Sequence, residues 1–385
     1  MKTGFWVASA LLCVACSCSR PAPSASSKQA ALDRTPAPIP HSREADDVAR
    51  FLAGIPGTPG SPFAEFEATT AWKQHRKILD AAWQRTNDRL IAGLTTFQRQ
   101  ELNRPGLERA PVFYPFAGPD ALTPLVCFPH SERYVLVALE PAGTLPSAAK
   151  IGKKNLPPYL AAIRNTMASI LGRSFFVTRE MDRQFRGQVT DGLLQPILLL
   201  LARTKHTVLG FRYVRLDETG KLIERPADFH VPGKIGNKGV EIEFRFDADQ
   251  SVHRLLYLSV NLANDRLHED PAFLTYAATL KGSTTLFKAT SYMLHKPEFS
   301  TISDLVVNQS GAVLQDDSGI PFARFATGWK VQLYGDYQRP YGSFRWMEQK
   351  DLRAAYRQPD VKPLPVQIGY GFRRIPSNMM LAVRN

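Results

Sequence analysis

Cysteine is scarce in this sequence, which limits the covalent chemistry open to it. Cys13, Cys16 and Cys18 belong to an apolar N-terminal segment, so Cys127 is left alone in the part expected to fold. A lone cysteine cannot close a disulfide within its domain. Cys127 lies in an apolar run, and buried cysteine commonly behaves as a small hydrophobic residue. We therefore expect a buried, unreactive thiol.

The short motifs of metal and hydrolase sites are absent as well. His230, His253, His268 and His295 stand singly, without H-x-x-x-H, H-E-x-x-H or C-x-x-C spacing in the expected domain. Neither a G-x-S-x-G turn nor a P-loop occurs. The sequence predicts no metal and no cofactor, and it offers no spacing from which a catalytic triad can be assembled.

No apolar run is long enough to remain in a bilayer as a spanning helix. The run at 5–15 follows Lys2 and is followed at once by small residues and by Cys16 and Cys18. This pattern is typical of a secretory signal, and residues 1–18 are interpreted as a lipoprotein-type signal peptide. Acylation of Cys18 or Cys16 would anchor the exported chain in the cell envelope, and the serine after either cysteine favours the outer membrane. A soluble periplasmic protein is the alternative, because the residues around Cys16 also suit an ordinary signal peptidase.

Negatively charged residues are fewer than positively charged ones. The chain has 48 Lys and Arg against 35 Asp and Glu, a formal net charge of +13. Export makes nucleic acid an unexpected partner, so the anionic partners at hand are envelope glycans and lipids. The basic residues are scattered singly, and a solvated surface without a partner explains them equally well. The oligomeric state is left open.

Composition divides the chain into segments. Residues 19–45 are rich in Pro, Ala and Ser and predict a disordered tether. Residues 46–385 predict a globular domain, with 205 as the place where it would subdivide if there were two. Helical signals dominate the first half, including 43–52 after the N-cap Ser42 and 61–92.

Strand signals follow. The alternation over 240–246 indicates a strand with one face in water, carrying Glu241 and Glu243. The sequence predicts an α+β (mixed α/β) fold in which a helical N-terminal part packs on a mixed or antiparallel sheet, as one large domain rather than two. Further strands are expected at 112–115, 133–140, 208–216, 252–262, 331–337 and 366–373, and further helices at 121–126, 156–171, 192–204, 271–294, 302–306 and 349–356.

Three carboxylates are candidates for catalysis. Asp120 follows a turn beside the aromatic Tyr114, where it would act as an acid or base, or else favour the positive end of the following helix from within its first turn. Asp316 and Asp317 are adjacent in a loop that ends in glycine, where ordinary turn chemistry is the alternative. Catalysis would require Asp120 and this loop to converge in one pocket.

Aromatic and basic residues alternate between 309 and 341. Aromatic planes stack on sugar rings and arginines bond sugar hydroxyls, so this segment predicts an exposed glycan-binding face centred on Trp329 and Tyr337. The alternative is that the rings are core or cross-strand pairs. The candidate binding residues are Tyr114, Arg324, Trp329, Tyr334, Tyr337 and Arg339.

The strings YPFAGPDAL, YVLVALEP, LQDDSGIPF and GYGF…SNMMLA carry a resemblance. Through them the chain resembles an uncharacterised family of bacterial cell-envelope lipoproteins over most of the mature domain. The resemblance implies an envelope location and a single domain, and it transfers no catalytic residue. We therefore expect a lipid-anchored envelope protein that acts by binding or scaffolding. The alternatives are a glycan- or peptidoglycan-directed hydrolase using paired carboxylates, and a purely structural envelope component.

Overall fold

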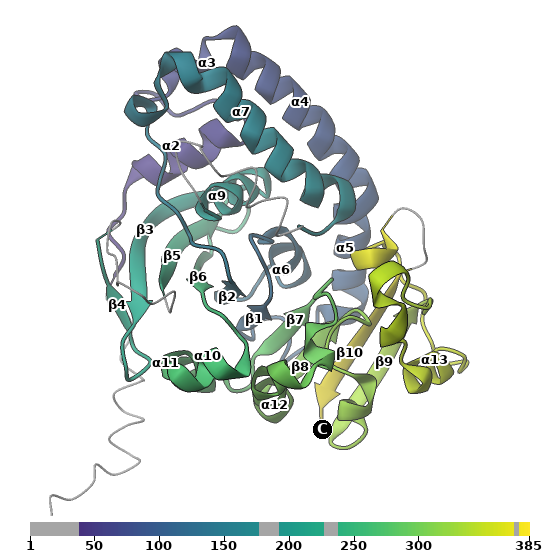
Figure 1. Ribbon diagram of the computed structural model, residues 1–385. Helices are drawn as coiled ribbons and strands as arrows, with labels where there is room; N and C mark the ends of the chain where they lie inside the picture. Colours follow the sequence, from purple (N-terminus) through teal and green to yellow (C-terminus); the bar gives the residue numbers. More distant parts are fainter. Residues whose placement is uncertain (1–37, 177–191, 227–237, 373–376) are drawn as a thin grey trace, which may run out of the picture. The chain divides into compact units, whose positions relative to one another are not determined.

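The computed structural model describes residues 38–176, 192–226, 238–372 and 377–385 (Figure 1). The expected signal peptide, Cys16, Cys18 and most of the tether lie outside the described residues. Residues 38–385 form one compact unit, in which helices pack on a single mixed sheet. This is the α+β class that the sequence predicts. Strands from both sides of residue 205 belong to the same sheet.

The sheet has ten strands in the described part of the chain, in the order β4-β3-β5-β6-β2-β1-β7-β8-β10-β9. The five central strands β6, β2, β1, β7 and β8 are parallel. The flanking pairs are antiparallel. The strands are β1 (Val112–Pro115), β2 (Arg133–Ala138), β3 (His206–Leu216), β4 (Leu222–Glu224), β5 (Lys238–Phe246), β6 (Val252–Ser259), β7 (Thr284–Phe287), β8 (Ala312–Gln315), β9 (Trp329–Gly335) and β10 (Asn378–Arg384).

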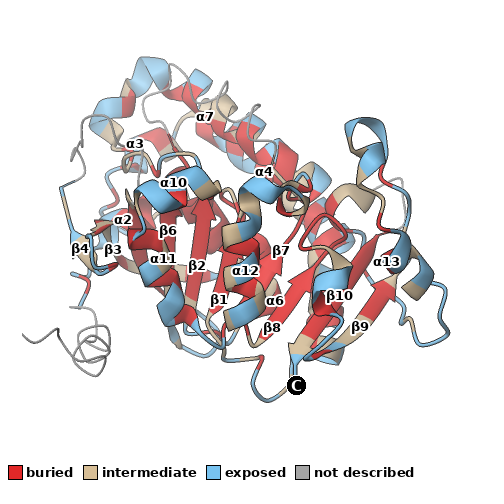
Figure 2. Cartoon of the chain, turned by 60° about the horizontal axis from the view of Figure 1, so that its bottom comes forward, coloured by how far each residue is buried: buried red, intermediate tan, exposed pale blue. Residues whose placement is uncertain are grey.

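Helices cover both faces of the sheet, so the unit has three layers and two apolar cores (Figure 2). One layer contains α2 (Arg43–Leu52), α3 (Ala64–Glu67), α4 (Thr70–Thr86), α5 (Ala92–Phe97), α6 (Leu122–Cys127), α7 (Ala148–Arg173) and α9 (Leu194–Arg203). The other contains α10 (Asn264–Glu269), α11 (Ala272–Ala277), α12 (Ser300–Gln309) and α13 (Lys350–Ala355). Strand side chains alternate between the two cores, as the two-residue period of a strand requires.

The N-terminal helices show where local signals suffice. Helix α2 has the predicted bounds, and the Ser42 side chain accepts a hydrogen bond from the Glu44 N–H at 3.2 Å. The single helix predicted over 61–92 is instead divided, because Thr69 is extended and caps α4 by accepting from the Trp72 N–H. Beyond α4 a π-helical turn (Asn87–Ile91) leads into α5, and a second such turn (Gln98–Leu102) follows it.

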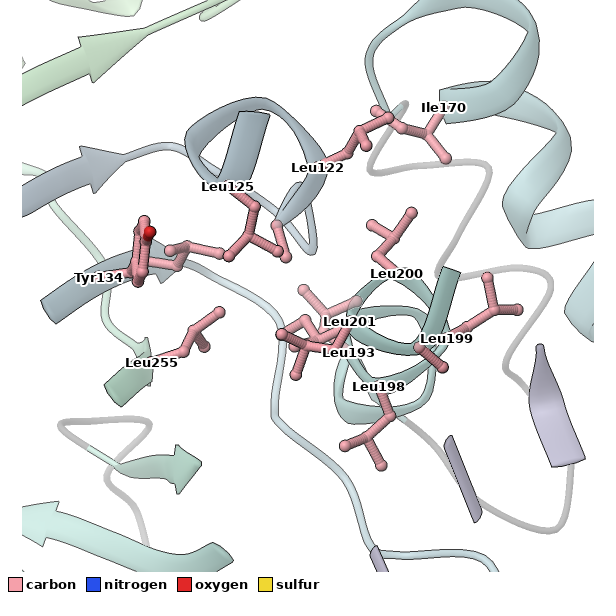
Figure 3. Packing of buried hydrophobic residues seen from close by; sticks show 14 of the residues in the cluster. Leu122, Leu125, Tyr134, Ile170, Leu193, Leu198, Leu199, Leu200, Leu201 and Leu255 are labelled. Atoms are coloured by element: carbon pink, nitrogen blue, oxygen red, sulfur yellow. The ribbon is translucent and has the colours of Figure 1, made fainter. Parts of the chain in front are cut away.

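Helix α9 is the buried core helix predicted for the leucine-rich run. Every residue from Leu194 to Ala202 is buried, which fits a helix that is apolar all round. Figure 3 shows Leu201 directed toward Tyr134 and Leu255 of the sheet, whereas Leu199 points to the other side of the helix. In the described part of the chain, no helix combines the length and the apolar character needed to cross a membrane.

Four strands were not predicted: the three-residue β4, the four-residue β7 and β8, and β10 at the end of the chain. β7 lies inside the predicted helix 271–294, and β8 lies in a stretch without a strand signal. Both have four residues buried on both faces, so neither shows the alternation by which a strand is recognised. The predicted closing strand at 366–373 is wrong, because Gly369 has φ 60° and begins a 3₁₀ turn there. β10 closes the sheet instead.

The predicted water-facing side of β5 is also wrong. Glu241 and Glu243 are buried, because α11 covers that face through Tyr276 and neighbouring strands supply arginines. The Arg212 guanidinium lies 2.5 Å from Glu241, and Arg254 lies 3.1 Å from Glu243. The alternation correctly predicts that Glu241 and Glu243 share one side of β5. It does not predict that α11 and the arginines of neighbouring strands shield this side from water.

Candidate functional site

The order of the parallel strands locates the place where a ligand is expected. From β1 the chain adds β2 and β6 on one side, and it then returns to add β7 and β8 on the other side. The strand order therefore reverses between β1 and β7. In open sheets of this kind, ligands bind outside the carboxyl ends of the strands at such a switch point.

A buried ion pair fills this switch point. Lys288 follows β7 and Asp120 follows β1, and the Lys288 Nζ lies 2.5 Å from the Asp120 Oδ2. The same ammonium donates to the Thr123 Oγ1 at 2.6 Å and to the Ser174 carbonyl oxygen at 2.5 Å. Only 3% of the surface of Lys288 is exposed, so all three of its N–H donors are used inside the protein.

Asp120 has a second structural role. Its Oδ1 accepts from the Thr123 N–H at 3.1 Å, which caps α6. The prediction that Asp120 lies inside the first turn of this helix is wrong, because α6 begins two residues later; the Asp120 side chain bonds forward to the first turn instead. The Tyr114 hydroxyl also donates to Asp120, at 3.1 Å. Burial, together with the Asp120 charge, raises the pKa of Tyr114 well above its ordinary value.

The thiol next to this cluster is inert. Cys127 at the end of α6 is buried, as the sequence predicts. Burial raises its pKa to about 12, and the nearby Lys288 charge offsets only part of that effect. A thiol with so high a pKa has almost no thiolate at neutral pH, and the thiolate is the reactive form.

The second acidic cluster follows β8, on the same edge of the sheet. The Asp316 Oδ2 accepts from the Ala289 N–H at 2.8 Å, and its Oδ1 accepts from the N–H and hydroxyl of Ser318. The Asp317 Oδ2 accepts from the Tyr292 hydroxyl at 2.6 Å, and its Oδ1 from the Asn378 amide at 3.0 Å. Every carboxylate oxygen of the pair therefore has a donor.

Burial shifts the acidity of both carboxyl groups in the same direction. It raises the pKa of Asp316 to about 6, with a further contribution from the Asp317 charge. Burial also raises the pKa of Asp317, and the hydrogen bonds from Tyr292 and Asn378 offset part of that rise.

Strained backbone gathers around these loops. Five of the seven non-glycine residues with left-handed φ in the described part of the chain lie here. Such conformations cost about 1–3 kcal/mol each, and they cluster at functional sites, where surrounding contacts hold them. The five residues are Phe116, Ser174, Ala289, Ser291 and Tyr292.

A pocket opens directly above the second acidic cluster. Its volume is about 350 Å³, within the usual range for small-molecule sites. Tyr292, Phe344 and Tyr370 form one wall, with ring centroids 5.2–6.2 Å apart. The full lining is Arg173, Phe175, Tyr292, Asp317, Gln338, Arg339, Pro340, Tyr341, Gly342, Ser343, Phe344, Tyr370, Gly371 and Asn378.

The buried network supports this pocket from below. Lys288 holds the Ser174 carbonyl, and the Ser174 hydroxyl accepts from the Gly369 N–H at 3.0 Å. Ser174 directly follows Arg173, and Gly369 directly precedes Tyr370, so both bonds fix residues next to the lining. The Tyr370 hydroxyl in turn donates to the Ala289 carbonyl at 3.2 Å. The ion pair at the switch point therefore positions the pocket wall.

The three carboxylates proposed for catalysis meet at one edge of the sheet but not in one pocket. Of Asp120, Asp316 and Asp317, only Asp317 lines the pocket, whereas the other two are buried beneath it. Catalysis would require Asp120 and the Asp316/Asp317 loop to share one pocket, and they do not share this one.

The predicted aromatic face does not form. Trp329 is buried against Phe325, and Tyr334 is buried with its hydroxyl on Glu101 at 2.7 Å. Tyr337 is half-buried and stacks on Tyr356.

The remaining candidate binding residues lie at different places in the structure. Arg324 is exposed and pairs with Asp304 at 2.6 Å, away from the pocket, and Tyr114 is buried on Asp120. Of the six candidates, only Arg339 lines the pocket.

Sequence reasoning missed Lys288, Tyr292, Tyr370 and Asn378. The first two were hidden because 271–294 was interpreted as a helix. The run Thr284-Thr285-Leu286-Phe287 after Gly282 carries a usable signal, since β-branched and aromatic residues after a glycine turn favour a strand. Tyr370 and Asn378 carry none, because their role depends on where β10 pairs.

Within the described residues, no group of three or more His, Cys, Asp and Glu side chains is arranged to hold a metal ion. No family model, no curated protein and no solved structure matches this chain.

Proposed function

We propose that this chain is a lipid-anchored protein of the bacterial cell envelope that binds an acidic sugar in the pocket beside Asp317. The anchor is the expected acylation at Cys18 or Cys16. The observation that carries the binding proposal is the lining of the pocket, which combines an aromatic wall, a carboxyl and amide pair, and two guanidinium groups.

Each part of the lining suits one part of such a ligand. The wall of Tyr292, Phe344 and Tyr370 offers apolar rings to the face of a sugar ring. Asp317 and Asn378 offer an acceptor and a donor to its hydroxyls. The guanidinium groups of Arg173 and Arg339 favour a carboxylate.

The local charge supports an anionic ligand. Arg339 lies 2.9 Å from Glu348, but Glu348 is shared with Arg353 at 2.5 Å, so one carboxylate faces two guanidinium groups. Arg173 is a second basic residue in the lining. A basic site of this kind recruits anions more strongly than neutral molecules.

Binding is favoured over hydrolysis for a geometric reason. Glycosidases need two carboxyl groups flanking the scissile bond, about 5–9.5 Å apart. Of the three candidate carboxylates, only Asp317 lines the pocket. The paired-carboxylate hydrolase lacks its second accessible carboxylate.

Saturation-transfer NMR with D-glucuronate and D-glucose tests the proposal, because the two sugars differ only in the carboxylate. We expect glucuronate to bind and glucose to bind at least about tenfold more weakly, the usual scale for one charge-assisted hydrogen bond. Arg339→Ala should weaken glucuronate binding by a similar factor. Arg345→Ala is the matched control, because Arg345 is exposed on the same loop and does not line the pocket.

Equal binding of the two sugars would contradict the anionic preference. Equal losses from the two arginine variants would place the ligand outside this pocket. Absence of binding by both sugars would remove the proposal.

A further inference from the structure

The basic excess of the chain is concentrated on two helices. α4 and α7 together carry nine basic residues and a single acidic one, Asp80. The net charge of the whole chain is +13, so this pair accounts for most of it. The basic residues are Lys73, Arg76, Lys77 and Arg85 on α4, and Lys150, Lys153, Lys154, Arg164 and Arg173 on α7.

The two helices lie side by side and run in the same direction. The Thr86 hydroxyl at the end of α4 donates to the Leu171 carbonyl near the end of α7, at 3.1 Å. Near the start, Lys153 on α7 lies 2.8 Å from Glu65, just before α4. Figure 1 shows the pair as neighbouring helices. The exposed lysines Lys73, Lys77 and Lys154 therefore lie on two adjacent helices, whose solvent-exposed side is here called the α4/α7 face.

Three of these lysines, Lys73, Lys77 and Lys154, are exposed and have no ion-pair partner within the part of the chain that the structure describes. The first turns of α7 hold three lysines and no carboxylate. Cations are disfavoured at that end of a helix, and of these three lysines Lys153 is the one paired with a carboxylate, Glu65, among the described residues.

An apolar side chain accompanies the charges. Ile78 on α4 is 39% exposed, directly beside Lys77. At a membrane surface, lysine stems lie along the interface while their ammonium groups reach the phosphates, and a small apolar side chain enters between head groups. A soluble polyanion would give Ile78 no such environment.

We infer that the α4/α7 face docks on an anionic phospholipid surface. The partner is recognised by charge and by interfacial burial of Ile78. This contact and an acyl anchor would act together, since one weak membrane signal gives only reversible attachment. The inference does not depend on the pocket or its ligand.

Vesicle sedimentation tests it with the chain beginning at Ser19, which keeps the whole compact unit of residues 38–385 and carries no acyl chain. The vesicles are phosphatidylcholine alone and an equal mixture with phosphatidylglycerol. We expect binding to the anionic vesicles only, and weaker binding as salt is added.

Charge reversal gives the decisive comparison. Each basic residue near an anionic surface contributes about fivefold in affinity, so K73E/K77E/K154E should bind roughly 100-fold more weakly or worse. The variant K281E/K296E/K330E is the control, because it changes the net charge equally at three exposed lysines outside both helices. It should retain most of the binding. Circular dichroism of both variants verifies the fold.

The outcomes separate cleanly. No binding to anionic vesicles at low salt would overturn the inference. Equal losses in the two triple variants would reduce it to a general effect of net charge. Binding to a soluble acidic polysaccharide without binding to vesicles would assign the face to a glycan instead.

Discussion

Replacing Lys288 by methionine should destabilise the protein severely. Methionine keeps much of the length and the apolar stem but removes the ammonium, which lies 2.5 Å from the Asp120 Oδ2 with 1% of the lysine side chain exposed. Asp120 would then be a buried charge without a counter-charge. Removing one partner of a buried ion pair typically costs about 3–5 kcal/mol of folding free energy.

The structure refines that figure. Asp120 keeps the hydroxyl of Tyr114 and both the N–H and hydroxyl of Thr123, so its remaining hydrogen bonds favour the lower end of the range. The Ser174 carbonyl, however, loses its lysine donor, which adds about 1 kcal/mol. We therefore expect a loss of about 4 kcal/mol. This is a large share of the ~5–15 kcal/mol by which proteins are usually stable.

Urea unfolding followed by circular dichroism measures the effect. Lys281→Met makes the same substitution at an exposed lysine and should change the free energy of unfolding by less than about 0.5 kcal/mol. The double variant K288M/D120N removes both charges and should lose clearly less than the sum of the two single variants. A K288M protein within about 1 kcal/mol of the parent, or strictly additive single and double losses, would refute the reasoning.

Two further predictions concern titratable groups. Burial and the Asp317 charge raise the folded-state pKa of Asp316 from 3.8 to about 6, so the folded chain holds a proton that the unfolded chain releases. The stability from this group is therefore complete below pH 3.8 and lost as pH rises through about 6. Asp316→Asn should flatten that part of the curve of unfolding midpoint against pH, and an unchanged curve would contradict the assignment. Because burial raises the pKa of Cys127 to about 12, a thiol reagent such as DTNB should modify the chain beginning at Ser19 only after denaturant is added. Rapid modification of the native protein would show that the thiol is accessible.

Local signals explain what the sequence predicts well. The N-cap at Ser42 and the helix Arg43–Leu52 agree with the structure, because a cap and its helix lie within one short stretch. The leucine run of α9 identifies a core helix, since a short helix that is apolar on every side has no other stable place in the described unit. The α+β class follows from the sum of such segments.

The site could not be predicted in the same way. Lys288 and Asp120 are 168 residues apart in the chain, and only the order of β1 and β7 in the sheet brings them together. β7 is four residues long and buried on both faces, so it leaves no periodic pattern. When β7 is not predicted, Lys288 cannot be placed at the sheet edge, and its contact with Asp120 cannot be predicted either.

The aromatic face failed for a related reason. The alternation of β9 correctly suggests a strand, but it does not say what covers each side. Phe97 on α5 packs edge-on against Tyr334 at 4.9 Å, and Phe325 packs against Trp329 at 5.3 Å. The cover over Tyr334 comes from a helix more than 200 residues earlier, which no window of local sequence can contain.

The side chains of Asp120 and Lys288 occupy the switch point, which argues against a ligand at that position. In doubly wound sheets, a phosphate commonly sits on the N–H groups of the helix that follows the first strand. Here the Asp120 carboxylate already accepts from the Thr123 N–H of that helix, and it already neutralises Lys288, the buried cation at the same place. A nucleotide phosphate would have to displace a carboxylate that has four hydrogen-bond or ionic contacts, and it would leave that carboxylate buried and uncompensated. The protein's own anion therefore occupies the position of the phosphate, and the accessible space lies further along the sheet edge, where β8 ends and β10 begins beside Asp317 and Asn378.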